Sequence, residues 1–137
     1  GIKIWRKNMP DNIKLSVTLP VKASKIYNAW FDKEAHSSFS RGKAIIEKKV
    51  GSEFTAVDGY IVGKINKMIL NKQIVMDWRT TEFPEGAEDS LVTVNFESLP
   101  ESTKVIIVHE NLPEDEGKRY RKEWKDNYFS LMKEYFV

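Results

Sequence analysis

The stretch that decides the fold is residues 54–86, FTAVDGYIVGKINKMILNKQIVMDWRTTEFPEG. Its first part predicts two strands joined at Asp58-Gly59, a favoured pair for a type I′ hairpin turn because both residues tolerate positive φ angles. Asn71-Lys72 then predicts a turn into a third strand at residues 73–80, in which every second side chain, from Ile74 to Trp78, faces the same side. The stretch therefore indicates an antiparallel meander.

The segments on either side complete an α+β pattern. A first strand is predicted at residues 13–19, where every second residue is apolar and Pro20 follows. Ser24 and Asp32 are candidate N-caps of two short helices, the second of which ends at about Phe39. Further strands are predicted at residues 44–49, 52–57, 60–70, 73–80, 90–97 and 103–111. Residues 1–12 are assigned to a lead-in or linker, and residues 13–137 to a single domain.

The last element is a long amphipathic helix, predicted at residues 115–136. At 100° per residue, five large side chains share one face: Tyr120, Trp124, Tyr128, Leu131 and Tyr135. Phe129, Met132 and Phe136 widen that stripe to nearly half of the helix surface. A helix with so wide an apolar face must lie against an apolar surface, and the meander is the natural candidate.

Composition excludes several classes of protein. With 137 residues and a hydrophobic content of 41%, the chain predicts one globular domain. The chain contains no Cys, which excludes disulfides and thiolate metal sites and fits a reducing compartment such as the cytoplasm. No run of about 18 apolar residues predicts a membrane span.

Charge is spread unevenly along the chain, although the net charge is only +2. Residues 1–50 hold 11 Lys and Arg against 4 Asp and Glu, and residues 51–117 hold 5 against 13. This separation suits docking on a protein with complementary patches, through either Lys48 and Lys49 or Glu82 and Glu85. The basic pieces are short and the pI is about 8.7, so nucleic-acid binding is not predicted.

The sequence shows no catalytic or metal-binding pattern. His36 has Ser37 and Ser38 beside it, a grouping that ordinary helix capping explains. His109 is in phase with the apolar residues of its strand, so it is expected to face the concave side of the sheet. The chain has no HExxH motif, no histidine pair at ligand spacing and no phosphate loop. We therefore expect a protein that is not an enzyme and that uses no metal or cofactor.

Aromatic side chains are the richest chemical resource of the chain. The candidates for the space between helix and sheet are Trp30, Phe54, Trp78, Phe96, His109, Trp124 and Tyr128. They either line a cavity for a lipid-like ligand or fill the interior, since each aromatic ring buries roughly 150–250 Å². The residues favour filling, and the sequence leaves the cavity as the alternative.

The order of these sequence motifs resembles that of the C-terminal domain of the activators of heat shock protein 90 ATPase. The resemblance covers about residues 13–136 and rests on the VDG hairpin with Gly63, on QIVMDWR at 73–79 and on FPEG at 83–86. Further matching pieces are Gly51-Ser52-Glu53-Phe54, Asn111-Leu112-Pro113, Trp124 and Tyr128-Phe129. Both the resemblance and the order of elements imply the helix-grip, or START-like, fold of the birch-pollen-allergen superfamily. In that fold a curved antiparallel sheet of about seven strands wraps the C-terminal helix.

The resemblance implies a cochaperone, expected to act as a monomer, that binds heat shock protein 90 and stimulates its ATPase by favouring the closed state. The activators of this family also have a separate N-terminal domain, which this sequence lacks. Either such a domain precedes this segment in the natural protein, or this is a single-domain relative with weak or absent activation. The alternative function is a START-like carrier of a small hydrophobic ligand in the helix–sheet cavity.

Overall fold

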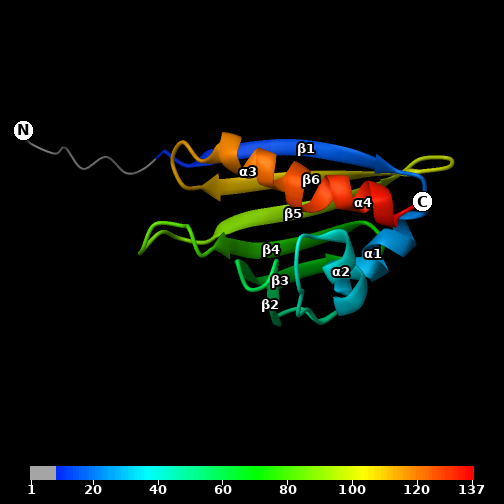
Figure 1. The fold of residues 1–137 in the computed structure, drawn as a ribbon, viewed down its shortest axis with the longest axis horizontal. Coiled ribbons are helices and arrows are strands. Elements are labelled where there is room, and N and C mark those ends of the chain that lie inside the picture. The colour runs from blue at the N-terminus through cyan, green and yellow to red at the C-terminus, as the bar shows by residue number, and fades with distance from the viewer. Residues whose placement is uncertain (1–8) are drawn as a thin grey trace, which may run out of the picture.

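The computed structural model describes residues 9–137 as a curved sheet that wraps a long C-terminal helix (Figure 1). The elements are β1 (Asp11–Leu19), α1 (Ala23–Phe31), α2 (Lys33–Phe39), β2 (Glu53–Ala56), β3 (Ile61–Ile69), β4 (Gln73–Thr80), β5 (Ser90–Ser98), β6 (Thr103–Leu112), α3 (Gly117–Trp124), the π-helical turn η1 (Lys125–Phe129) and α4 (Ser130–Tyr135). The last three form one continuous helix. The helix-grip fold expected from the sequence is confirmed.

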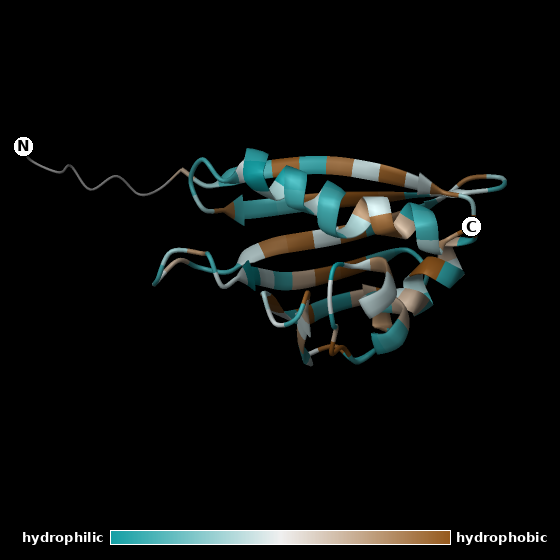
Figure 2. Cartoon of the chain, viewed as in Figure 1, coloured by the Kyte–Doolittle hydropathy of each residue, from teal (hydrophilic) through white to brown (hydrophobic). Residues whose placement is uncertain are grey.

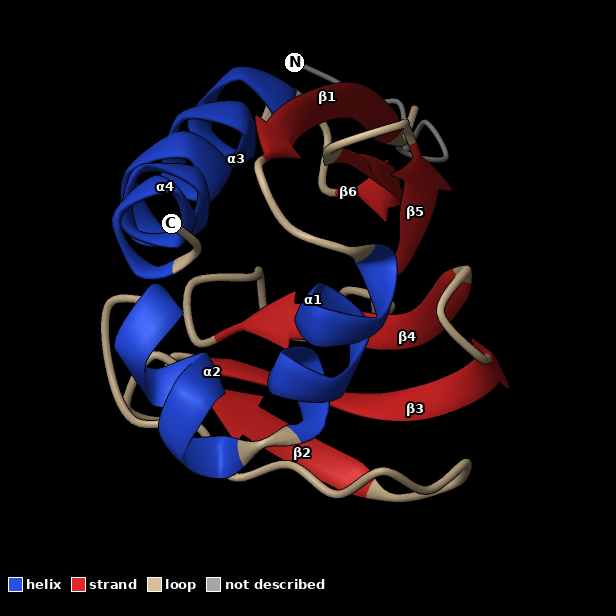
Figure 3. Cartoon of the chain, turned by 90° about the vertical axis from the view of Figure 1, so that its right-hand side faces the viewer, coloured by secondary structure: helices blue, strands red, loops and turns tan. Residues whose placement is uncertain are grey.

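The sheet is antiparallel throughout, with strand order β1-β6-β5-β4-β3-β2. Alternation along the strands sends apolar side chains to the concave face, as the bands along β1 show (Figure 2). Leu15, Ile107, Val94 and Ile74 form one row across four strands, and all four are buried. Figure 3 shows the sheet curling around the C-terminal helix, with α1 and α2 beside it.

The sheet has six strands, so the predicted strand at residues 44–49 is wrong. Only Ile45 pairs with β2, through hydrogen bonds of 2.9 and 3.0 Å to and from Thr55. The Lys49 N–H then bonds to the Glu47 carbonyl, so the chain turns away from the strand. Ala44 and Ile46 are buried and Ile45 is exposed, as in a strand. The burial pattern was therefore right, but the hydrogen-bonded ladder stops after one pair.

The hairpin between β2 and β3 has a longer loop than predicted. Asp58 and Gly59 have the expected positive φ angles, 57° and 84°, but Val57 also has φ of 51°. The Gly59 N–H bonds to the Ala56 carbonyl and the Tyr60 N–H to the Val57 carbonyl, which makes two overlapping left-handed turns. The Asp58 carboxylate also accepts the Lys43 N–H at 2.9 Å and so holds the residues before Ile45 against this loop.

The helix ends test the capping predictions. Asp32 caps α2 as predicted, because its Oδ1 accepts the N–H groups of Glu34 and Ala35 at 2.9 and 3.1 Å. Ser24 does not cap α1, which begins at Ala23 without a side-chain cap. Of the predicted lead-in, residues 1–8 lie outside the described residues, and Asp11 belongs to β1. Asp11 accepts the Gly117 N–H at 2.7 Å and so secures the first turn of α3.

The C-terminal helix buries six of the eight side chains in the predicted stripe. An unbroken α-helix would place Tyr120 and Phe136, sixteen residues apart, about 160° apart around the axis. The wider turn η1 accommodates one extra residue and removes about 100° of that drift. Tyr120, Trp124, Tyr128, Met132 and Phe136 are consequently all buried. Leu131 is only half-buried and Tyr135 is 41% exposed, so their predicted places in the stripe are wrong.

Side chains stabilise the π turn by bonding to its backbone. The Asp126 carbonyl accepts a hydrogen bond from Arg41 Nη2 at 2.9 Å and another from Ser130 Oγ at 3.2 Å. Arg41 lies in the loop after α2, so it also ties that loop to the C-terminal helix.

Within residues 9–137, no helix combines the length and apolar character needed to cross a membrane.

Gly63 in β3 should be the glycine whose substitution costs most. A Cβ at this position would overlap the Asp77 carbonyl oxygen and lie 2.6 Å from Cε1 of Phe54, and the backbone oxygen cannot move aside. We expect Gly63→Ala to reduce the free energy of unfolding by about 3 kcal/mol in urea titrations. Gly86→Ala is the control, because Gly86 has a positive φ of 81° but no neighbour within 4 Å. It should lose about 1 kcal/mol from backbone strain alone, and equal losses in the two variants would contradict the role of close packing.

Candidate functional site

The predicted cavity residues are all buried, but they do not form one group. Trp30, Phe54, Trp78, Phe96, His109, Trp124 and Tyr128 are each at most 6% exposed. Trp78 stacks on Trp124 with centroids 5.8 Å apart, and Trp30 stacks on Tyr128 at 5.6 Å. His109 contacts both Trp78 and Trp124, so these five rings lie together under the C-terminal helix. Phe96 instead packs on Tyr27, and Phe54 lies against Gly63.

The space that these rings enclose is very small. A cavity of about 10 Å³ lies between the helix and the sheet, lined by Ile61, Trp78, Tyr120, Glu123, Trp124, Asn127 and Tyr128. That volume is roughly what one water molecule requires. The aromatic side chains therefore fill the interior of this conformation and leave no room for an organic ligand.

His109 is the centre of a fully paired polar chain. Its Nδ1 accepts the indole N–H of Trp124 at 3.0 Å, so its Nε2 carries the proton and donates to Ser90 Oγ at 2.8 Å. The Ser90 hydroxyl in turn donates to the Trp78 carbonyl at 2.7 Å. Burial lowers the pKa of His109 to about 3. Both ring nitrogens are occupied, which leaves no free lone pair to act as a general base.

His36 occupies a second buried position that the sequence did not reveal. Its Nδ1 lies 2.7 Å from the Trp30 carbonyl, which can only accept, so Nδ1 donates and Nε2 accepts the Tyr128 hydroxyl proton at 2.7 Å. Burial lowers the pKa of His36 to about 4, against the smaller effect of its bond to the Trp30 carbonyl. Ser37 and Ser38, the neighbours that suggested capping, bond back to the carbonyls of Lys33 and Glu34.

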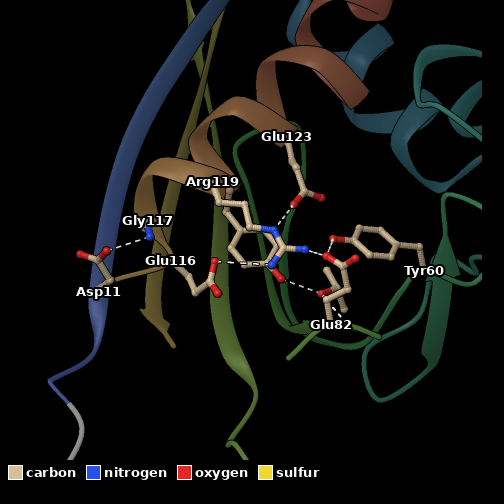
Figure 4. Close-up of polar contacts among 9 residues, drawn as sticks. Asp11, Tyr60, Glu82, Glu116, Gly117, Arg119 and Glu123 are labelled. Atoms are coloured by element: carbon tan, nitrogen blue, oxygen red, sulfur yellow. Dashed lines mark hydrogen bonds and ion pairs between the residues drawn. The ribbon is translucent and has the colours of Figure 1, made fainter. Parts of the chain in front are cut away.

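An ion-pair cluster surrounds Arg119 (Figure 4), and one member of the cluster, Glu123, lines the small cavity. Arg119 in α3 pairs with Glu82 of the β4–β5 loop, with Glu116 at 3.6 Å and with Glu123 at 3.2 Å. The Tyr60 hydroxyl donates to Glu82 at 3.3 Å. The spacing of Glu116, Arg119 and Glu123 is visible in the sequence as i, i+3 and i+4 pairing. The contact with Glu82, which ties α3 to a distant loop, is not.

The two predicted docking pairs lie in different surroundings. Glu82 is engaged by Arg119, and Glu85 is exposed in the same β4–β5 loop. Lys48 and Lys49 are exposed in the loop before β2, where Lys48 contacts α1. The β4–β5 loop and α1 stand at opposite ends of the sheet (Figure 1). The structure therefore keeps the two docking pairs apart.

Two hollows lie elsewhere on the surface. A hollow of about 440 Å³ on the convex face includes Ile45, Val62, Lys64 and Arg79, and another of about 460 Å³ lies beside the start of α1. In the part of the chain that the structure describes, no three His, Asp or Glu side chains are placed to hold a metal ion.

The two buried histidines should make the stability depend on pH. Their pKa values are lowered from 6.5 in the folded state, so the unfolded chain binds more protons below that value. Stability should be complete above pH 6.5 and should fall as the pH drops toward 4 for His36 and 3 for His109. At pH 5 we expect a loss of roughly 2 kcal/mol for each histidine, measured by urea unfolding at pH 7 and pH 5.

A variant without one histidine provides the comparison. His109→Gln cannot titrate, so its difference in unfolding free energy between pH 7 and pH 5 should be about half that of the unmodified chain. An unchanged difference would show that His109 is not held neutral in the folded protein.

The sequence is similar to proteins of a known family. Residues 20–136 match the family described as "Activator of Hsp90 ATPase homolog 1-like protein". The human activator of 90 kDa heat shock protein ATPase homolog 1 is 28% identical over 124 residues, which is 90% of this chain and 36% of the human protein. The mouse homolog 2 is 25% identical over 121 residues, 88% of this chain and 36% of that protein. The chain thus spans about a third of the length of these curated relatives.

Solved structures agree with the sequence comparison. An HSP90 activator from Plasmodium falciparum is 28% identical, with a TM-score of 0.77, and the match covers 87% of this chain and 91% of that one. Protein CV1439 from Chromobacterium violaceum has a TM-score of 0.73 at 19% identity, covering 93% of this chain and 98% of that one, and shows the fold alone. On the match over residues 20–136, the chain belongs to the family of Hsp90 ATPase activator homolog 1-like proteins.

Proposed function

We propose that this domain is a cochaperone that binds heat shock protein 90 and stimulates its ATPase. The observation that carries the proposal is the family match over residues 20–136, together with the similarity to the Plasmodium activator over 91% of that structure. Because the chain spans about a third of the curated relatives, the activity of those whole proteins is an expectation for this one. The expected compartment is that of the chaperone, the cytoplasm.

The domain would act by contact and not by chemistry of its own. His36 and His109 use both ring nitrogens in internal hydrogen bonds, and the interior holds a cavity of only about 10 Å³. These features favour a role for the outer surface over the alternative of a ligand carrier. A monomer that carries its basic and acidic residues in different segments of the chain is suited to docking on a larger protein.

The proposed mechanism is a shift in the population of chaperone conformations. A domain that binds the closed, N-terminally dimerised chaperone more tightly than the open form favours the state that hydrolyses ATP. A tenfold preference for the closed form corresponds to about 1.4 kcal/mol and would change the ratio of the two forms tenfold at saturation. The domain itself needs no nucleotide site for this effect.

Nucleotide should therefore strengthen the complex. In calorimetric titrations of purified heat shock protein 90, we expect a lower Kd with a non-hydrolysable ATP analogue than with ADP, because binding and closure are thermodynamically linked. The domain should also raise the ATP turnover of the chaperone. Equal affinity with both nucleotides would remove the population-shift mechanism. Absence of binding, accompanied by a lipid that co-purifies with the domain, would support the carrier function instead.

A further inference from the structure

The lysine loop, residues 47–52, is a fixed turn at the edge of the sheet. The Lys49 N–H bonds to the Glu47 carbonyl at 2.9 Å, and the Lys49 carbonyl accepts the N–H and the hydroxyl of Ser52 at 3.2 and 2.6 Å. The Gly51 N–H bonds to the Ile65 carbonyl in β3 at 2.8 Å, which anchors the turn to the sheet. The backbone that carries Lys48 and Lys49 is thus ordered before any partner arrives.

Lys48 is oriented onto the surface of α1. Its ammonium donates to Asn28 Oδ1 at 2.8 Å and lies over the Tyr27 ring, 5.2 Å from the centroid. Lys25 precedes Asn28 by three residues and is exposed, so it shares the same side of the helix. Lys25, Lys48 and Lys49 together form a cationic patch, called here the lysine face.

The three lysines of the lysine face form no ion pair within the described chain, and Glu47 is the acidic residue that shares the loop of Lys48 and Lys49. The ion pairs among residues 9–137 join Arg79 to Asp89, Arg119 to three glutamates, and Lys122 to Asp126. None of them includes Lys25, Lys48 or Lys49. Glu82, Glu116 and Glu123 are thus paired with Arg119, whereas the three lysines of the lysine face remain available to a negatively charged partner.

An aliphatic side chain directly follows the lysines. Val50 comes after Lys49 in the same loop and is 55% exposed. A phosphate backbone gains little from covering an aliphatic side chain, whereas a protein surface buries such side chains in the centre of an interface with a charged rim. The combination of lysines with an exposed valine therefore favours a protein over a nucleic acid as the occupant.

We propose that the lysine face, with Val50, is the docking surface for an acidic, partly apolar surface of a partner protein. This inference rests on the proposed function, under which the partner is heat shock protein 90. It assigns the docking role to Lys48 and Lys49 and places Glu82 and Glu85 away from the interface.

Charge reversal with a matched control tests the assignment. We expect the double variant Lys48→Glu, Lys49→Glu to bind the chaperone at least tenfold more weakly than the unmodified domain in calorimetry. The control is Lys118→Glu with Lys125→Glu, which makes the same change of charge at two exposed residues that are in none of the described ion pairs. The control and Glu82→Lys with Glu85→Lys should stay within twofold. The proposal would be overturned if Glu82→Lys with Glu85→Lys lost binding while Lys48→Glu, Lys49→Glu kept it.

Two further measurements separate this surface from the function. Val50→Ser, which keeps every charge, should weaken binding to the chaperone about threefold. Raising the salt from 50 to 300 mM should reduce the affinity less in the variant Lys48→Glu, Lys49→Glu than in the unmodified domain.

A synthetic peptide of alternating glutamate and leucine serves as a second ligand. Peptide binding that the lysine variant loses, without any binding to the chaperone, would retain the surface and reject the proposed function. Equal binding of the peptide by both forms, or tighter binding of a mixed-sequence RNA than of the peptide, would overturn the surface.

Discussion

The hydrogen bond from Trp124 to His109 is the contact on which the arrangement of helix and sheet depends. It places the middle of the C-terminal helix against β6, and His109 and Ser90 extend the chain of donors through β5 to the carbonyl of Trp78 in β4. One line of polar atoms thus ties the helix to three neighbouring strands inside an otherwise apolar face. Every member is satisfied only while His109 is neutral, with its proton on Nε2. Such a network specifies one helix position where purely apolar packing would tolerate several.

A helix held this firmly decides where function can reside. Its aromatic rings reduce the interior to a space of one water molecule, and Arg119 fastens its first turns to the β4–β5 loop. The interior therefore has no space for an organic ligand, and the proposed binding of a partner protein would use the outer surface. That surface is divided, because arginines and a lysine neutralise carboxylates near the start of the C-terminal helix, while the lysines near α1 lack counterions among the described residues.

Sequence patterns predicted the elements that local periodicity determines. The alternation of apolar side chains located the six strands, and Asp32 located a helix start, since both signals depend on residues close in the chain. Residues 44–49 show the limit of this reasoning, because their alternation is that of a strand but their backbone pairs only at Ile45. Alternation reports which face is buried and carries no information on whether a ladder continues.

Contacts between distant residues could not be predicted in this way. His36 meets Tyr128, 92 residues later, and the serines next to it in sequence suggested a different role. Arg119 pairs with Glu82, which lies in the loop between β4 and β5. Asp11, near the other end of the chain, accepts the Gly117 N–H at the start of α3. Five of the seven candidate aromatic and histidine residues lie together, and they fill the interior, as the aromatic content favoured. Their sequence spacing did not reveal which of the seven would meet.

The π turn has a consequence for how relatives of this chain should be aligned. It holds one residue more than a regular helix would need between Trp124 and Ser130, and it does so without turning Met132 and Phe136 out of the interior. A relative that is one residue shorter here could wind as an unbroken α-helix and still present the same buried side chains. A gap in an alignment therefore belongs inside residues 125–129. If it were placed elsewhere in the helix, every later position would be compared with a residue about 100° away around the axis.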